Sequence, residues 1–145
     1  VCMMARDQQH PPLAGQILIS PMLDPCAATP SQRAAQGESV ECKWAAGWCQ
    51  YLGGPHDAEH PYAVPARARR LAGLPPTLIL VGQIDPMRDE ALNYAARLEA
   101  AGLTVFPHVF AEVGQWPEAL MEPPPESCPC EGQLRQFFET TRCRL

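Results

Sequence analysis

The chain has no apolar run long enough to cross a membrane and no excess of positive charge. A membrane-spanning helix needs about 20 consecutive apolar residues, and none of the 145-residue sequence approaches that. The net charge of −5 disfavours a general nucleic-acid-binding protein, because such domains normally carry a basic face. The first residues contain no basic segment followed by an apolar one, so we expect no signal peptide.

The seven cysteines also lack the spacing that is typical of a metal site or of a disulfide framework. They are odd in number and scattered, and the nearest pair, Cys128 and Cys130, has no second paired half. We therefore expect reduced, unliganded thiols and a cytoplasmic location, because disulfides rarely persist in a reducing compartment. The first residue is Val1 and not an initiator methionine, which suggests a fragment.

The residues that are present predict an α/β fold in a single domain. Apolar runs bounded by turn residues predict strands at 14–20, 77–82 and 103–110, and helical spacing predicts helices at 40–52, 88–101 and 133–142. The 17 prolines favour many loops, above all an irregular segment at 117–132. The helix at 88–101 joins two strands, so we expect a parallel sheet with flanking helices. Pro107 lacks a backbone donor and places its strand at a sheet edge.

Three residues stand where catalytic groups collect in such sheets, or near that place. Ligands bind beyond the carboxyl ends of parallel strands. Asp85 follows the second predicted strand, where it could orient a histidine or only bond amides of its own turn. Asp24 follows the first strand and precedes a proline, which favours a structural turn. His108 falls inside the third strand, which favours a structural role there.

Other motifs carry weaker signals. The basic run at 67–70 is interpreted as a solvent-exposed face. His56 and His60 could suggest a metal site, but nothing in the sequence aligns them, so a polar loop is expected. Trp44 and Trp48 fit a core or a pocket wall. No Gly-x-Ser-x-Gly nucleophile turn occurs anywhere in the sequence.

The ordered motifs between residues 5 and 110 resemble α/β-hydrolases of the hormone-sensitive-lipase-like esterase group. The motifs that carry the resemblance are Ala5-Arg6-Asp7, residues 11–19, Pro21-Met22-Leu23-Asp24, Tyr51-Leu52-Gly53, His60-Pro61-Tyr62-Ala63, residues 71–77 and, most specifically, Asp85-Pro86-Met87-Arg88-Asp89-Glu90. The resemblance implies a Ser–Asp–His esterase that acts on small-molecule carboxylic esters without metal or organic cofactor. It makes Asp85 the triad acid and the three strands the last three of an eight-stranded sheet.

The sequence departs from that family pattern in several places. No counterpart of the family's nucleophile turn or of its oxyanion-hole His-Gly-Gly-Gly segment is present. The family's histidine comes about 30 residues after the acid, and this count reaches Gln115, whose neutral amide cannot accept and return a proton. The first hypothesis is therefore the C-terminal part (residues 1–145) of a carboxylic-ester hydrolase, inactive alone.

Two alternatives remain open. The first is a non-enzymatic binding or scaffold module that has kept the fold and lost the chemistry, as Gln115 suggests. The second alternative is an enzyme in which His108 pairs with Asp85 and another chain supplies the nucleophile. The sequence does not define an oligomeric state.

Overall fold

A three-stranded parallel sheet forms the centre of the chain. The computed structural model describes residues 1–26, 28–36, 43–111 and 130–142. The strands are β1 (Gln16–Ile19), β2 (Thr77–Gly82) and β3 (Val105–Phe110), in the order β1-β2-β3. Thr77 is aligned with Gln16 on one side and with Val105 on the other. The predicted parallel sheet is confirmed, and Pro107 lies in an edge strand of the described sheet, as expected.

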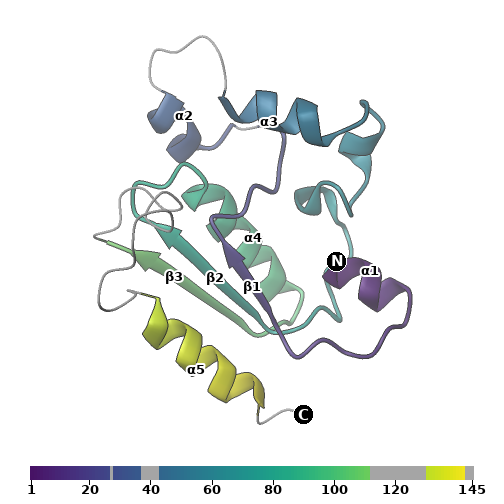
Figure 1. Ribbon diagram of the computed structural model, residues 1–145, viewed down its shortest axis with the longest axis vertical. Coiled ribbons are helices and arrows are strands. Elements are labelled where there is room, and N and C mark those ends of the chain that lie inside the picture. Colours follow the sequence, from purple (N-terminus) through teal and green to yellow (C-terminus); the bar gives the residue numbers. More distant parts are fainter. Residues whose placement is uncertain (27, 37–42, 112–129, 143–145) are drawn as a thin grey trace.

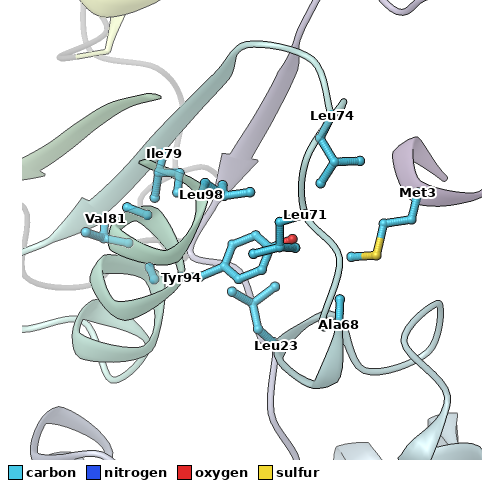
Figure 2. Close-up of a cluster of buried hydrophobic side chains, with 11 residues drawn as sticks. Met3, Leu23, Ala68, Leu71, Leu74, Ile79, Val81, Tyr94 and Leu98 are labelled. Carbon is cyan, nitrogen blue, oxygen red and sulfur yellow. The ribbon is translucent and has the colours of Figure 1, made fainter. Parts of the chain in front are cut away.

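The central strand β2 is buried on both faces, and its side chains divide between two cores. Ile79 and Val81 face the larger core (Figure 2), to which α4 (Arg88–Ala100) contributes Tyr94 and Leu98. Leu78 and Leu80 point the other way and pack with Phe137 of α5 (Glu131–Arg142). This alternation follows from the two-residue repeat of a strand. It places α4 and α5 on opposite faces of the sheet (Figure 1).

Helix α4 and its boundaries agree closely with the sequence pattern. Asp89 and Glu90 occupy its first turn, where the positive end of the helix dipole favours negative charge. The chain leaves the helix through Gly102, whose φ of +82° is a conformation that glycine adopts without steric penalty. The Leu103 N–H then bonds the Leu98 carbonyl at 3.1 Å, and the chain enters β3. The predicted strand–helix–strand unit is therefore confirmed.

Among the described residues, three α-helices precede β2. Helix α3 (Lys43–Tyr51) was predicted, and it buries Trp48. Helix α1 (Cys2–Asp7) lies before β1 and sends Met3 into the larger core. Helix α2 (Pro30–Gln36) was not predicted, because its short sequence PSQRAAQ carries no apolar repeat. Two single turns of 3₁₀ helix, Asp57–Glu59 and Pro65–Arg67, complete the path to β2.

The cysteines depart in part from the expectation of free thiols. Cys2, Cys26 and Cys49 are free thiols. Cys130 is disulfide-bonded, so the expectation is wrong for this residue. Cys130 is 5% exposed and packs in the core between β2 and α5, directly before the first residue of that helix.

No helix within the described ranges combines the length and the apolar character that a membrane span requires.

Candidate active site

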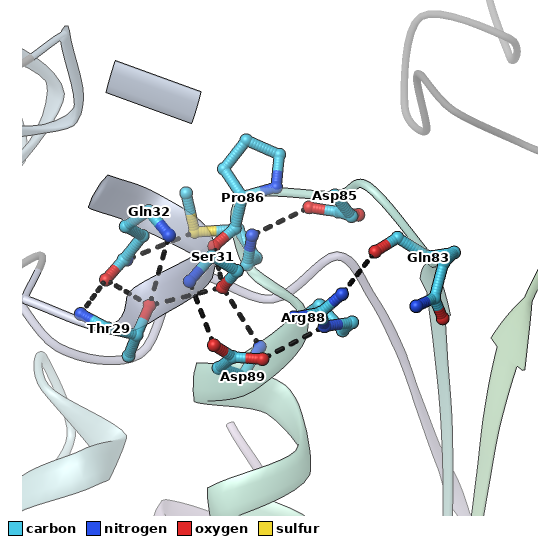
Figure 3. A network of polar contacts seen from close by, with 9 residues as sticks. Thr29, Ser31, Gln32, Gln83, Asp85, Pro86, Arg88 and Asp89 are labelled. Carbon is cyan, nitrogen blue, oxygen red and sulfur yellow. Dashed lines mark hydrogen bonds and ion pairs between the residues drawn. The ribbon is translucent and has the colours of Figure 1, made fainter. Parts of the chain in front are cut away.

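Asp85 lies in the tight loop that joins the carboxyl end of β2 to α4. The loop closes through two backbone bonds, from the Asp85 N–H to the Gly82 carbonyl (3.2 Å) and from the Arg88 N–H to the Asp85 carbonyl (3.1 Å). The residue is 1% exposed. Its Oδ1 accepts the Met87 backbone N–H at 2.8 Å (Figure 3). Such a buried carboxylate needs donors on both oxygens to offset its lost hydration.

The second oxygen of Asp85 accepts a hydrogen bond from Ser20, a partner that the sequence pattern did not indicate. Ser20 follows β1 directly, and its hydroxyl donates to Asp85 Oδ2. Its backbone N–H bonds the Leu80 carbonyl at 3.0 Å, and its φ of +42° is unusual for a residue other than glycine. The parallel pairing of Ile19 with Leu80 brings the two strand ends together. That register is the signal that could have identified Ser20.

Asp89 anchors α2 to the first turn of α4. One Asp89 oxygen accepts the Ser31 backbone N–H at 2.9 Å, and the other accepts Arg88 Nε at 2.9 Å (Figure 3). Ser31 Oγ in turn donates to the Pro86 carbonyl at 2.8 Å. Burial raises the pKa of Asp89, but the Ser31 N–H and the Arg88 guanidinium together outweigh burial and hold that pKa below its usual value.

Glu90 anchors the segment that follows β1. Its Oε1 accepts the backbone N–H groups of Leu23 and Asp24, and its Oε2 accepts Gln32 Nε2 at 2.8 Å. Burial raises the pKa of Glu90 above its ordinary value, although these three donors act in the opposite direction. The short stretch 85–90 is therefore connected to three other parts of the chain. Asp85 contacts the end of β1, Asp89 contacts α2, and Glu90 contacts the segment between β1 and α2.

The structure does not bring His108 to Asp85. His108 lies in β3, its ring stacks edge-on against Phe110 at 4.5 Å between centroids, and its Nε2 is 3.3 Å from Gln133 Nε2 of α5. Within the described part of the chain, no hydrogen bond joins it to Asp85. The structural role expected for this histidine agrees with these contacts.

The remaining candidates have structural roles or lie outside the described residues. Asp24 Oδ1 accepts the Cys26 N–H at 2.9 Å, the turn that its sequence predicted. His60 Nδ1 accepts the Tyr62 N–H at 3.2 Å, within the polar loop that was expected. In the described ranges no three metal-ligating side chains gather. Gln115 and Cys128 lie outside the described residues.

The geometry around Asp85 suits one chemical task. A buried, fixed carboxylate beyond a strand end can accept the Nδ1–H of an imidazole, hold the ring in one tautomer and stabilise its protonated form. Met87 and Ser20 restrain both oxygens of Asp85 before any such partner arrives. Preorganised groups of this kind are what proton-transfer sites require.

Comparison with known proteins gives the family. A model of the α/β-hydrolase fold matches residues 1–114. Esterase LipI of Mycobacterium tuberculosis is 34% identical over 111 residues, a match that covers 74% of this chain and 35% of the relative. Ethyl acetate hydrolase of Pseudomonas putida is 32% identical over 94 residues, covering 62% and 29%. The solved structure of a bacterial heroin esterase aligns with a TM-score of 0.76 and 33% identity, covering 98% of this chain and 46% of the esterase.

These matches cover much of this chain but only part of each relative. The chain spans about a third of the length of the curated relatives it matches, 35% and 29% in the two named above. The parallel sheet, helices α1 to α4 and the loop that holds Asp85 all lie within the matched residues 1–114, whereas α5 lies outside them. The chain belongs to the α/β-hydrolase fold family.

Proposed function

We propose that this chain supplies the acid-bearing portion of a Ser–Asp–His carboxylic-ester hydrolase, with Asp85 as the triad acid. The observation that carries the proposal is the buried Asp85 carboxylate, fixed through both oxygens at the carboxyl end of the central strand. The relatives add the reaction class, because they are named as esterases and as an ethyl acetate hydrolase. The proposed substrate is a small-molecule ester, and the proposed chemistry needs no cofactor.

In this mechanism Asp85 stays ionised throughout. It accepts the Nδ1–H of a histidine, which leaves Nε2 free to take the proton of a serine hydroxyl as that oxygen attacks the ester carbonyl. The imidazolium that results is stabilised by the Asp85 charge and then returns the proton to the departing alcohol. This chain contains no Gly-x-Ser-x-Gly segment, so the nucleophile must come from residues other than these 145.

We further propose that Gln115 occupies the histidine position and cannot serve as the base. An amide has no nitrogen that binds and releases a proton near neutral pH. The 145-residue chain alone is therefore expected to be inactive toward esters. If Gln115 marks lost chemistry in the whole protein as well, the fold would serve as a non-enzymatic binding or scaffold module.

A cytoplasmic location remains part of the proposal, and the free thiols of Cys2, Cys26 and Cys49 support it. The disulfide at Cys130 counts against it, because such bonds are uncommon in a reducing compartment. Counting the thiols of the native protein by alkylation and mass spectrometry tests the proposal. Full reduction at Cys130 in the cell supports the cytoplasm, and stable oxidation contradicts it.

A chimera tests the function without depending on the isolated chain. In the chimera, residues 1–145 carrying Gln115→His replace the part of the bacterial heroin esterase that aligns with 98% of this chain, and the upstream part of that esterase is kept. We expect hydrolysis of p-nitrophenyl acetate, and a loss of about 10⁴-fold in kcat on Asp85→Asn. Asp24→Asn is the matched control: it also follows a strand, but its carboxylate only caps the Cys26 turn.

The outcomes separate the two functions. A loss specific to Asp85→Asn supports the triad role. Equal losses from both Asp→Asn changes, or full activity without the Asp85 carboxylate, would contradict it. A folded Gln115→His chimera with no activity at all would favour the binding or scaffold module.

A further inference from the structure

A large groove lies away from the proposed catalytic edge and collects arginines. It has a volume of about 970 Å³ and runs between the end of α1 and residues 59–62 and 67–70. Figure 1 shows α1 on the side of the molecule away from the strand arrowheads, and Asp85 follows one of these arrowheads. The charged and aromatic side chains that line the groove are Arg6, Asp7, Glu59, Tyr62, Arg67, Arg69 and Arg70.

The charge of this groove is opposite to that of the whole chain. The chain has a net charge of −5 and only 11 lysines and arginines, yet four arginines line this one groove. Two carboxylates, Asp7 and Glu59, line it as well, so four positive and two negative charges leave a surplus of two positive charges. A concave surface of one charge sign concentrates ligands of the opposite sign.

The walls of the groove are held in place by Arg6. Its Nη1 donates to the carbonyls of Arg70 and Ala72, both at 2.9 Å, which ties α1 to the basic segment. Its Nε donates to Asp7 at 2.8 Å, and the Tyr62 hydroxyl donates to the same carboxylate at 3.0 Å. Gly73 has a φ of +77°, and a Cβ there would meet Arg6 Cδ at 3.4 Å. The sequence thus fixes the groove before any ligand binds.

The positive charge that remains available belongs to the three arginines of the segment 67–70. Arg6 and Asp7 neutralise each other, and the ion pairs recorded among the described residues do not include Arg67, Arg69 or Arg70. All three are exposed. Arg67 has a distant contact, with its Nη2 3.8 Å from Cys26 Sγ. Three guanidinium groups therefore face solvent beside a preformed hollow.

We propose that this groove binds a multiply charged phosphate-type anion through Arg67, Arg69 and Arg70. Guanidinium groups present paired donors that match phosphate oxygens and remain charged at every physiological pH. A single carboxylate would neutralise only one of the three guanidinium charges, whereas a group with several anionic oxygens can contact two or three of them together. This site is separate from the proposed ester chemistry, because within the described ranges no hydrogen bond or ion pair joins Arg67, Arg69 or Arg70 to the Asp85 loop.

Calorimetric titration with inorganic pyrophosphate tests the site on the full 145-residue chain, at constant ionic strength set with sodium chloride. We expect saturable binding that Arg69→Gln/Arg70→Gln weakens by about tenfold or more, the equivalent of one lost charged hydrogen bond. The matched control is Arg135→Gln/Arg142→Gln, which removes the same charge from exposed positions of α5. It should leave the affinity within about twofold.

Two results would overturn the proposal: binding that never saturates, and equal weakening by both double variants, which would mean a general effect of charge. A repeat in the chimera keeps the test valid if the isolated chain does not stay monomeric. Vesicles of phosphatidylcholine with phosphatidic acid distinguish the source of the phosphate. Co-sedimentation that depends on Arg69 and Arg70 identifies a lipid headgroup, and binding of pyrophosphate alone identifies a soluble ligand.

Discussion

Asp85, Asp89 and Glu90 show how one six-residue motif can hold three different contacts. Each carboxylate is bound by donors from a different segment: Asp85 by Ser20, Asp89 by Ser31, and Glu90 by the backbone after β1. The sequence identified Asp85 because its position after a strand is a local property. It missed Ser20 as a partner, because that contact depends on the register between β1 and β2, which lie about 60 residues apart in the chain.

Ser20→Ala and Ser20→Gly separate the hydrogen bond from the backbone strain. Both changes remove the donor to Asp85, so both should slow ester hydrolysis by the Gln115→His chimera to a similar extent. Glycine accepts the positive φ of this position, so the Ser20→Gly variant should be more stable than Ser20→Ala by about 1 kcal/mol. Urea unfolding and kcat measure the two effects. Slower hydrolysis in only one of the variants would contradict a role for the hydroxyl.

Asp89→Ala should weaken the dependence of the unfolding free energy on pH in the acid range. The pKa of Asp89 is lowered in the folded state, so its contribution is complete above its unfolded pKa of about 3.9 and is lost as pH falls through the folded pKa. At pH 7 the unfolding free energy of the chimera should be about 1–2 kcal/mol lower with Asp89→Ala than without it. Near pH 2 the difference should shrink.

The exposed Glu139 of α5 provides the control for this change, as Glu139→Ala should alter stability little at either pH. Urea unfolding at several pH values measures both variants. A loss on Asp89→Ala that stays constant across the pH range would show that the charge of Asp89 has no part in anchoring α2.

At the scale of elements, the sequence predicted the helices and strands whose apolar residues recur in a regular local pattern. The apolar run at 77–82 coincides with β2, and the spacing after Arg88 gave α4. Helix α2 was not predicted, because it is held in place by contacts with Asp89 and Glu90 of α4 and not by a local apolar pattern. Helix α5 was expected to begin at Gln133 but begins at Glu131, next to the disulfide-bonded Cys130.

Gly15→Ala tests the packing of α5 against the start of β1. A Cβ at position 15 would lie 2.7 Å from Cζ and 2.9 Å from Cε1 of Phe137, closer than atoms pack. The ring or the helix must move, so we expect a loss of about 1–3 kcal/mol in the unfolding free energy of the chimera.

Gly132→Ala is the matched control, because nothing lies within 4 Å of its added Cβ. This change should stabilise α5 by a few tenths of a kcal/mol, up to about 1, through helix propensity. Urea unfolding gives both values, and a neutral Gly15→Ala would mean that α5 does not pack on this glycine.

At the scale of the molecule, the described sheet has an open edge at β1. Strand β1 is only half-buried, whereas β2 is buried throughout, and Ile19 is 40% exposed. An unpaired, apolar strand edge promotes association with other chains. We therefore expect the 145-residue chain to aggregate when it is isolated.

Ile19→Lys should reduce this aggregation, because a charge on an edge strand opposes pairing with another strand. Ile84→Lys provides the control: Ile84 is more exposed, at 67%, but lies in the loop after β2. Light scattering during concentration measures both. Equal suppression by the two lysines would show that net charge, and not the β1 edge, governs association.

A double-mutant cycle between positions 85 and 115 of the chimera tests the central claim most directly. If Asp85 acts only through a histidine at position 115, Asp85→Asn should lower kcat about 10⁴-fold in the Gln115→His background. In the background that keeps Gln115, the same change should have almost no effect. Equal losses in both backgrounds would contradict the assignment of Asp85 as the acid of an ester-hydrolysing triad.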